Sequence, residues 1–155
     1  LRMRTFSKAY GLAGMRCGYA VGEAKAIRAF DKVRDHFGMC RMTQTAALAA
    51  LADGNHLATV LGEVAASRAR IARIAEESGL AALPSATNFV AVDCGGDGAF
   101  AQAVLQGLIE RDIFVRKPAA PVLDRCIRIS TGPAAEMDAL AEAFAPALAA
   151  ARAGA

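Results

Sequence analysis

The sequence has little of what metal centres and disulfide frameworks need. It contains only two histidines in 155 residues, and neither His36 nor His56 has an acid or a cysteine at the spacing of a shared ligand set. Its four cysteines form no Cys-x-x-Cys pair and lie in apolar segments, which favours buried, reduced thiols (Cys17, Cys40, Cys94 and Cys126). We therefore expect no metal site, and reduced thiols indicate a cytoplasmic protein.

Long apolar runs and concentrated positive charge are also missing. No stretch has the uninterrupted apolar length of a membrane span, and no charged-then-apolar signal segment opens the chain. The net charge of +3 is spread along the sequence without a basic stripe, and aromatic residues make up only 6%. With 55% hydrophobic residues and abundant alanine, the composition predicts a soluble, helix-rich globular protein that binds neither nucleic acid nor membrane.

One segment near the amino terminus carries recognisable chemistry. Residues 5–19 read TFSKAYGLAGMRCGY and place a lysine, Lys8, beside the hydroxyl of Ser7 and eight positions before Arg16. A lysine amine condenses with a carbonyl to form a Schiff base, while a hydroxyl and a guanidinium can hold the oxygens of a phosphate. Glycines in the segment let the backbone approach such a ligand closely (Gly11 and Gly14). The combination suits an aldehyde cofactor that carries a phosphate.

Residues 7–19, SKAYGLAGMRCGY, resemble the lysine motif of fold-type-I pyridoxal-phosphate aminotransferases, in particular the histidinol-phosphate aminotransferase branch. The resemblance implies an α/β fold, pyridoxal 5'-phosphate as cofactor, and a homodimer in histidine biosynthesis. It also implies that Lys8 is the catalytic residue and that Ser7, Lys8 and Arg16 bind the cofactor. In that family the freed lysine acts as a general base at the substrate's α-carbon.

The motif begins almost at residue 1, whereas the family's lysine lies well past the middle of the enzyme. The chain therefore resembles the carboxy-terminal portion of such an enzyme. We expect residues 1–54 to be the end of the large cofactor-binding domain, and residues 55–155 to be an interdomain helix and a small α/β domain. Asp31 and Asp35 fall on a predicted helix after the motif, so neither replaces the family aspartate that pairs with the pyridine nitrogen.

Hydrophobic periodicity and turn residues predict the elements. Gly79 is placed to end a long helix, and Pro133 to begin the last one. The predicted helices cover 23–36, 43–52, 56–78, 100–110 and the residues after 133. The predicted strands are a buried one at 17–21 and three more at 88–93, 113–116 and 126–130. Turns or loops are expected at 53–55, 84–87 and 117–123.

Arg128 is the strongest candidate for binding a substrate anion. Ile127 and Ile129 share one face of the predicted strand, which leaves Arg128 on the opposite face with Ser130. The run RISTG at 128–132 resembles the family context in which an arginine holds the substrate's anionic group. Arg116, at the end of another predicted strand, resembles with a weaker signal the arginine that helps hold the phosphate of histidinol phosphate.

Three further residues have plainer interpretations. Asn88 also matches a family segment, but its simplest role is to satisfy backbone groups where a loop enters a strand. Tyr10 either approaches the active site or packs under the motif loop, and we expect packing. Arg41 departs from the small polar residues expected at its position, and either alters substrate preference or caps the following helix.

The resemblance implies transfer of an amino group between a donor, histidinol phosphate or a related amino acid, and 2-oxoglutarate through a Schiff base on Lys8. The residues leave alternatives open. The same pattern serves aromatic or other amino-acid aminotransferases, and decarboxylases of the same fold. From a different class, the chain could be a noncatalytic α/β binding fragment that keeps the lysine segment.

Overall fold

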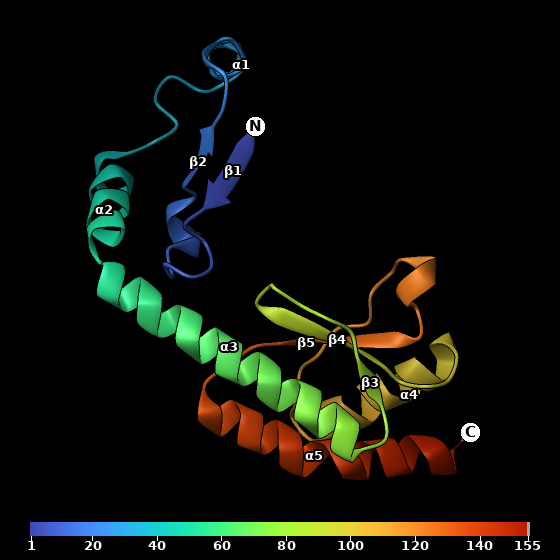
Figure 1. The fold of residues 1–155 in the computed structure, drawn as a ribbon. Coiled ribbons are helices and arrows are strands. Elements are labelled where there is room, and N and C mark those ends of the chain that lie inside the picture. The colour runs from blue at the N-terminus through green and yellow to red at the C-terminus, as the bar shows by residue number, and fades with distance from the viewer. Residues whose placement is uncertain (155) are drawn as a thin grey trace. The chain divides into compact units, whose positions relative to one another are not determined.

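The longest element of the chain is a helix, α3 (Gly54–Glu77), which matches the helix predicted at 56–78. The computed structural model describes residues 1–154 and divides into two units, Leu1–Leu61 and Gly62–Ala155, so that the division falls inside α3 (Figure 1). The assignment of residues 1–54 to a large domain and of 55–155 to a small one remains a prediction.

A two-stranded antiparallel sheet opens the first unit. Strands β1 (Arg2–Thr5) and β2 (Gly18–Val21) pair from Arg2 opposite Val21 to Thr5 opposite Gly18. The strand predicted at 17–21 is therefore present, but the expectation that it is buried is wrong. The residues of β2 are exposed or half-buried, and only Cys17, which precedes the strand, is buried.

The helix predicted at 23–36 is much shorter in the structure. It consists of α1 (Ala24–Ala29) followed by one 3-10 turn, η2 (Phe30–Lys32). The second half of its apolar stripe is uncovered, since Val33 and Phe37 are 82% and 94% exposed, whereas Ala26 and Ile27 in the first half are half-buried. A short helix without tertiary packing is marginal in water, and the Asp35 carboxylate accepts the Phe37 N–H at 3.0 Å, which competes with a further helical turn.

Helix α2 (Arg41–Ala52) confirms the helix predicted at 43–52, and only Asp53 separates it from α3. The turn expected over 53–55 is thus reduced to a single residue. Oδ1 of Asp53 accepts the N–H of His56 at 2.9 Å, the bond of a helix cap, so Gly54 and Asn55 belong to the first turn of α3. The first unit buries few apolar side chains, and these line the space between the hairpin loop and α2 (Phe6, Cys17 and Ala47).

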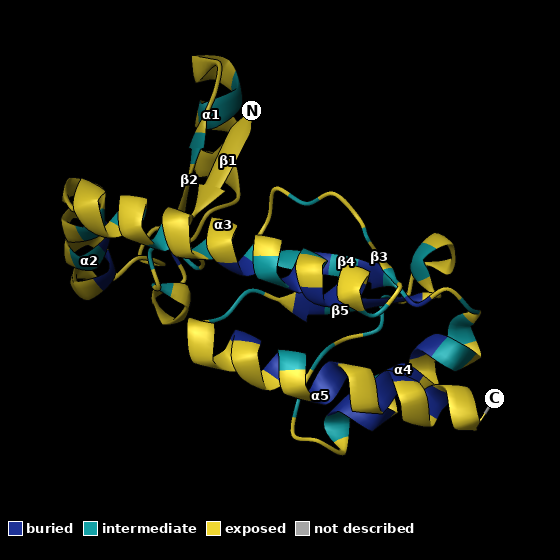
Figure 2. Ribbon diagram, turned by 60° about the horizontal axis from the view of Figure 1, so that its bottom comes forward, coloured by how far each residue is buried: buried dark blue, intermediate teal, exposed yellow. Residues whose placement is uncertain are grey.

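Most of the core lies in the second unit. Its antiparallel sheet has the order β3 (Ala81–Ala82), β4 (Phe89–Asp93), β5 (Cys126–Ser130), and α4 (Gly98–Ile109) and α5 (Ala134–Ala153) are its other helices. Figure 2 shows the buried positions on the strands and on the inner sides of the helices. The largest fully buried side chains come from every layer (Ile71, Val92, Val104, Leu108, Ile127, Leu140 and Phe144).

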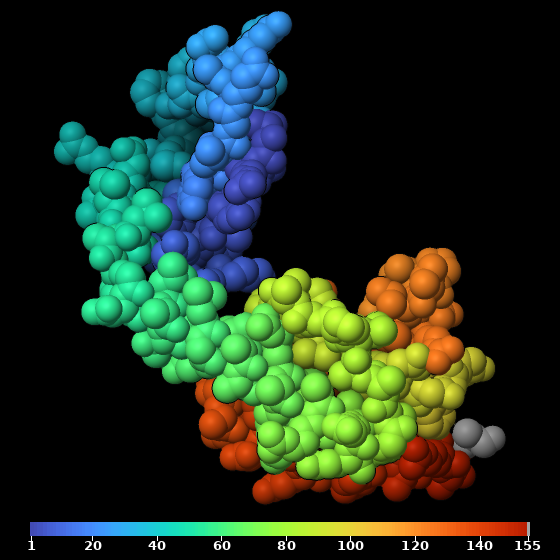
Figure 3. Space-filling model, viewed as in Figure 1, coloured from blue at the N-terminus to red at the C-terminus, as the bar shows by residue number. Residues whose placement is uncertain are grey.

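The strand predicted at 113–116 is not formed; a single bridge joins Arg116 to Arg128. Asp112 has a φ of +61°, a left-handed conformation that turns the chain immediately before this segment. After it, Pro118 has no N–H to extend a ladder. Residues 117–123 instead form a loop with one 3-10 turn, η3 (Pro121–Leu123), which projects from the rest of the second unit as an orange lobe in Figure 3.

The helix ends in the second unit follow the sequence closely. Gly79, at φ +73°, ends α3 as predicted; its N–H binds the Glu76 carbonyl, and the Leu80 N–H binds the Ala75 carbonyl at 2.9 Å. At the start of α4, Oδ1 of Asp97 accepts the N–H groups of Ala99 and Phe100 at 3.0 and 2.9 Å. No helix in residues 1–154 is long and apolar enough to cross a membrane.

Candidate functional site

The hairpin brings Ser7 and Arg16 together although nine positions separate them. The Phe6 N–H donates to the Cys17 carbonyl at 3.1 Å, which continues the β1–β2 register by one pair. Ser7 and Arg16 are the next residues on the two sides of the hairpin, so both follow the last backbone hydrogen bond at the same end of the strand pair. The sequence predicted that they share a ligand, and loop closure is the feature that makes them neighbours.

Lys8 lies on the loop that this hairpin closes. The Gly11 N–H donates to the Lys8 carbonyl at 2.8 Å, and the Leu12 N–H donates to the Phe6 carbonyl at 2.9 Å. Gly11 makes the turn at φ +67°, a conformation that favours glycine. Ser7 is fixed by its own N–H, which donates to the Thr5 hydroxyl at 3.1 Å. The backbone around Lys8 is therefore ordered by local hydrogen bonds, while its side chain remains exposed.

The loop carries two cations without an acidic partner. Within residues 1–154, neither Lys8 nor Arg16 forms a salt bridge, and the hydrogen bond of the Arg16 guanidinium goes to the Ala13 carbonyl at 2.6 Å. A Cβ placed on Gly11 or Gly14 would meet no atom within 4 Å, so space lies beside the backbone. Uncompensated positive charge, a hydroxyl and open space fit a ligand with a phosphate group.

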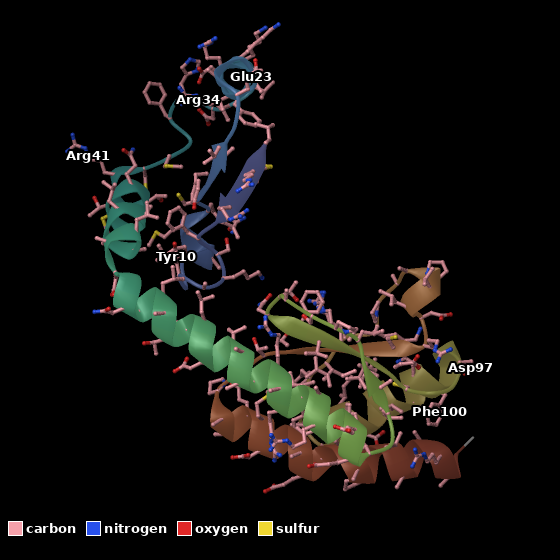
Figure 4. All side chains as sticks on the ribbon, in the orientation of Figure 1. Tyr10, Glu23, Arg34, Arg41, Asp97 and Phe100 are labelled. Atoms are coloured by element: carbon pink, nitrogen blue, oxygen red, sulfur yellow. The ribbon has the colours of Figure 1, made fainter. Side chains whose placement is uncertain are left out.

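The underside of the loop rests on aromatic rings and on α2. The ring of Tyr10 lies 4.9 Å from that of Phe6, centroid to centroid, which confirms the prediction that Tyr10 packs under the loop (Figure 4). The buried Thr43 of α2 donates its hydroxyl to the Met15 carbonyl at 3.2 Å. The sequence did not indicate this contact, because it joins residues 28 positions apart.

Arg41 and Cys40 stand at the start of α2. Arg41 is exposed, and no side chain caps this helix, which leaves the capping interpretation of Arg41 without support (Figure 4). Cys40 is exposed, so the expectation of a buried thiol is wrong there, whereas the other three cysteines are buried. The Thr43 hydroxyl and the first backbone N–H groups of α2 lower the pKa of the Cys40 thiol.

Arg128 lies on β5 as the alternation predicted. Ile127 and Ile129 are buried on one face, and the Arg128 side chain lies on the other, with its Cζ 5.0 Å from the centroid of the Phe89 ring. Its Nε is buried without a hydrogen-bond partner in the described residues. The backbone carbonyl of Asn88 accepts the N–H of Thr131 at 2.9 Å, and the role predicted for the Asn88 side chain stays a prediction.

Arg116 is directly opposite Arg128. Each donates its N–H to the carbonyl of the other, at 3.1 and 2.6 Å, so both side chains emerge on the same face about 5.5 Å apart at Cα. Among residues 1–154, neither forms a salt bridge. Two directly paired arginines that form no salt bridge within residues 1–154 make this strand pair a candidate anion site.

The acid nearest along the β4 face, Asp93, is engaged elsewhere. Arg125 donates its Nε to Oδ1 of Asp93 at 2.9 Å, and its Nη2 lies 2.5 Å from Oδ2. This arginine lowers the pKa of the Asp93 carboxyl. Neither this ion pair nor the Phe89 stack was predicted from the sequence; strand alternation could have shown that these residues share a face, had the β4–β5 register been known.

The lysine loop and the α/β fold define a class of protein. A family model, aminotransferase class I and II, matches residues 1–144, and the chain belongs to this family. The fold class and the family expected from the lysine motif are thereby confirmed. Within residues 1–154, no group of three or more His, Cys, Asp or Glu side chains could hold a metal ion.

Several individual relatives are histidinol-phosphate aminotransferases. The chain is 40% identical to the enzyme of Geotalea daltonii over 136 residues, which are 87% of the chain and 38% of the relative. It is also 40% identical to the enzyme of Geobacillus thermodenitrificans over 140 residues, which are 90% of the chain and 38% of that relative. It superposes on the histidinol-phosphate aminotransferase of Sinorhizobium meliloti, solved in complex with pyridoxal-5'-phosphate, with a TM-score of 0.91 and 55% identity over 99% of the chain and 41% of the relative. The chain thus spans about two fifths of these proteins.

Proposed function

We propose that the protein is a pyridoxal-phosphate-dependent aminotransferase that moves an amino group between histidinol phosphate, or a related amino acid, and 2-oxoglutarate. The observation that carries the proposal is the hairpin loop that holds Ser7, Lys8 and Arg16, in which the exposed Lys8 forms no salt bridge within residues 1–154. The S. meliloti relative, at 55% identity, was solved with this cofactor. The same similarity favours a cytoplasmic homodimer that acts in histidine biosynthesis.

Three residues would hold the cofactor. Lys8 would be its covalent anchor, and the Ser7 hydroxyl and the Arg16 guanidinium would bind its phosphate oxygens. When bound, pyridoxal 5'-phosphate supplies the aldehyde that the lysine binds and an electron-withdrawing ring that weakens the bond to the substrate's α-hydrogen. The ordered backbone of the loop keeps the anchor and the phosphate ligands in a fixed relation.

The chain's own side chains perform the remaining steps. The Lys8 Nζ, once free, would take the proton from the α-carbon of the substrate and deliver it to the carbon of the cofactor that keeps the amino group, so one group is both tether and general base. Arg128, helped by Arg116, binds the negatively charged group of the substrate. Fixing that group decides which bond at the α-carbon is aligned for cleavage.

The test is the absorption spectrum of the native, full-length protein, followed by borohydride reduction and peptide mapping. We expect an absorption band of the bound cofactor and a stable pyridoxyl adduct on the peptide that contains Lys8. Lys8→Arg, which keeps the charge but cannot form the adduct, is the matched control and should show no transamination. A reduced protein without an adduct on this peptide would overturn the proposal in favour of a noncatalytic binding fragment.

Substrate assays distinguish the remaining enzyme classes. With 2-oxoglutarate as acceptor, histidinol phosphate should support faster turnover than phenylalanine or tyrosine. Faster turnover of the aromatic amino acids would indicate an aromatic aminotransferase, and release of carbon dioxide without glutamate would indicate a decarboxylase. Either result contradicts the proposed substrate and leaves the role of Lys8 standing.

A further inference from the structure

The guanidinium of Arg128 is supported by an aromatic ring and not by an acid. Its Cζ lies 5.0 Å from the centroid of Phe89, a distance at which the negative face of the ring attracts a cation. Its Nε is buried without a hydrogen-bond partner, and no carboxylate within residues 1–154 forms a salt bridge with it. Within residues 1–154, the guanidinium thus has a ring contact and no salt bridge.

An aromatic support has a different effect from an acidic one. A carboxylate would occupy the N–H groups of the guanidinium and neutralise its charge, so it would compete with any incoming anion. A ring face attracts the cation while its N–H edge and its full charge remain available. For a residue that must bind a substrate anion, this is the more effective arrangement.

The neighbouring residues on this face of the sheet preserve the arrangement. Ala91, directly opposite Arg128, has only a methyl group, which leaves room for the guanidinium to lie over Phe89 one pair further along the strands. Asp93, on the other side of Ala91, would be a competing acid, but Arg125 binds both of its carboxylate oxygens. The one acid on this face of β4 is thereby kept in an ion pair of its own.

Phe89 is itself held in position at the start of β4. Its carbonyl accepts the Ser85 hydroxyl at 2.5 Å and the Thr87 hydroxyl at 3.3 Å. The preceding residue, Asn88, accepts from both the N–H and the hydroxyl of Thr131, at 2.9 and 3.1 Å, which ties β4 to the end of β5. The backbone that carries the ring is thus fixed against the strand that carries Arg128.

We propose that Phe89 is a positioning residue for substrate binding: its ring orients the Arg128 guanidinium and leaves its charge uncompensated for the substrate's anionic group. The inference rests on the proposed function, since it takes Arg128 as the group that binds this anion. It extends that function by assigning a role to a residue that would not touch the substrate.

The test uses the full-length holoenzyme with histidinol phosphate as the donor and compares Phe89→Leu, Phe89→Tyr and Arg128→Ala with the parent protein. We expect Phe89→Leu to raise KM by about 3- to 30-fold, the range of a cation–π contact, with kcat changed by less than about 2-fold. Phe89→Tyr keeps the ring face and should keep KM. Phe100→Leu, which removes a ring that packs on the core from α4, should lower Tm without raising KM (Figure 4).

Replacing Phe89 by pentafluorophenylalanine separates orientation from packing. The fluorinated ring has nearly the same shape, but its electron-poor face does not attract a cation, so KM should rise while Tm stays near that of the parent. This variant also provides the test if Phe89→Leu fails to fold. An unchanged KM in the fluorinated protein would overturn the inference.

Arg128→Ala distinguishes failure of the inference from failure of the proposed function. If Arg128→Ala raises KM and loss of the Phe89 ring face does not, Phe89 has no positioning role and the substrate assignment of Arg128 stands. If Arg128→Ala leaves KM unchanged, the assignment of Arg128 itself is wrong, and the role of Phe89 falls with it.

Discussion

Single thiols in this chain differ widely in their surroundings. Burial raises the pKa of the Cys94 thiol to about 11, and burial also raises the pKa of Cys126. Cys40 is exposed, and hydrogen bonds from Thr43 lower its pKa. Since the thiolate is the reactive form, the four cysteines should react in an order set by these environments.

We expect iodoacetamide at about pH 8 to label Cys40 of the 155-residue polypeptide at least about ten times faster than Cys94. Peptide mapping at increasing reaction times would measure the two rates. Labelling in denaturant, where all thiols are equally exposed, is the control and should remove the difference. Equal rates in the native protein would contradict the burial of Cys94.

The ion pair between Asp93 and Arg125 should make stability depend on pH. Because Arg125 lowers the pKa of Asp93 in the folded state, the pair stabilises the fold above the ordinary pKa of an aspartate. That contribution is lost as the pH falls and the carboxyl takes up a proton. We expect Arg125→Ala to lower Tm at about pH 7 and to have little effect at about pH 2. A Tm difference that is the same at both pH values would show that Arg125 acts by packing instead.

At the scale of elements, one glycine within α3 and one just after its end provide opposite tests of backbone conformation. Gly62 is helical and Gly79 has a φ of +73°, and a Cβ on either would meet no atom within 4 Å. Gly62→Ala should therefore stabilise the fold by about 1 kcal/mol through helix propensity. Gly79→Ala should destabilise it by about 1 kcal/mol, because a left-handed residue with a Cβ is strained. Urea unfolding measures the change in the free energy of unfolding for each variant. Changes of the same sign in the two variants would contradict this account.

The elements that the sequence predicted well are those whose apolar stripes find a partner in the fold. Helices α3, α4 and α5 bury such stripes, and the periodicity indicated each of them. The helix predicted at 23–36 had a similar stripe, but its second half, with Val33 and Phe37, is uncovered, and the helix ends at Lys32. Periodicity reports which face could be buried, but whether it is buried depends on tertiary structure.

The residues of the candidate site could be predicted from the sequence, but the contacts between them could not. The motif identified Ser7, Lys8 and Arg16, and strand alternation placed Arg128 on the face away from the core. The Phe6–Cys17 hydrogen bond that makes Ser7 and Arg16 neighbours, and the stack of Arg128 on Phe89, depend on register. Register arises from pairing between distant segments, so a single sequence does not define it.

At the scale of the whole molecule, burial is uneven between the two units. The second unit has a continuous core from α3 to α5, while the first buries three apolar residues and exposes Val33 and Phe37. Backbone amides in regions with few buried contacts open at lower free energy. The two units should therefore differ in local stability.

Hydrogen exchange of the 155-residue polypeptide, followed by mass spectrometry, would measure this difference. We expect the amides of β4 and β5 to exchange at least about tenfold more slowly than those of β1 and β2, since the former pair over a buried face and the latter over an exposed one. Equal protection of the two sheets would contradict the uneven packing.

The pairing of Arg116 with Arg128 has a practical consequence for the choice of buffer. Two paired arginines that form no salt bridge in the described part of the chain attract small multivalent anions from solution, and this attraction weakens as ionic strength rises. Phosphate or sulfate in an assay would then occupy the strand pair and compete with substrate. A KM measured in such a buffer would be raised, because the substrate has to displace the bound anion. A KM measured in a chloride-poor amine buffer would describe binding to the free site.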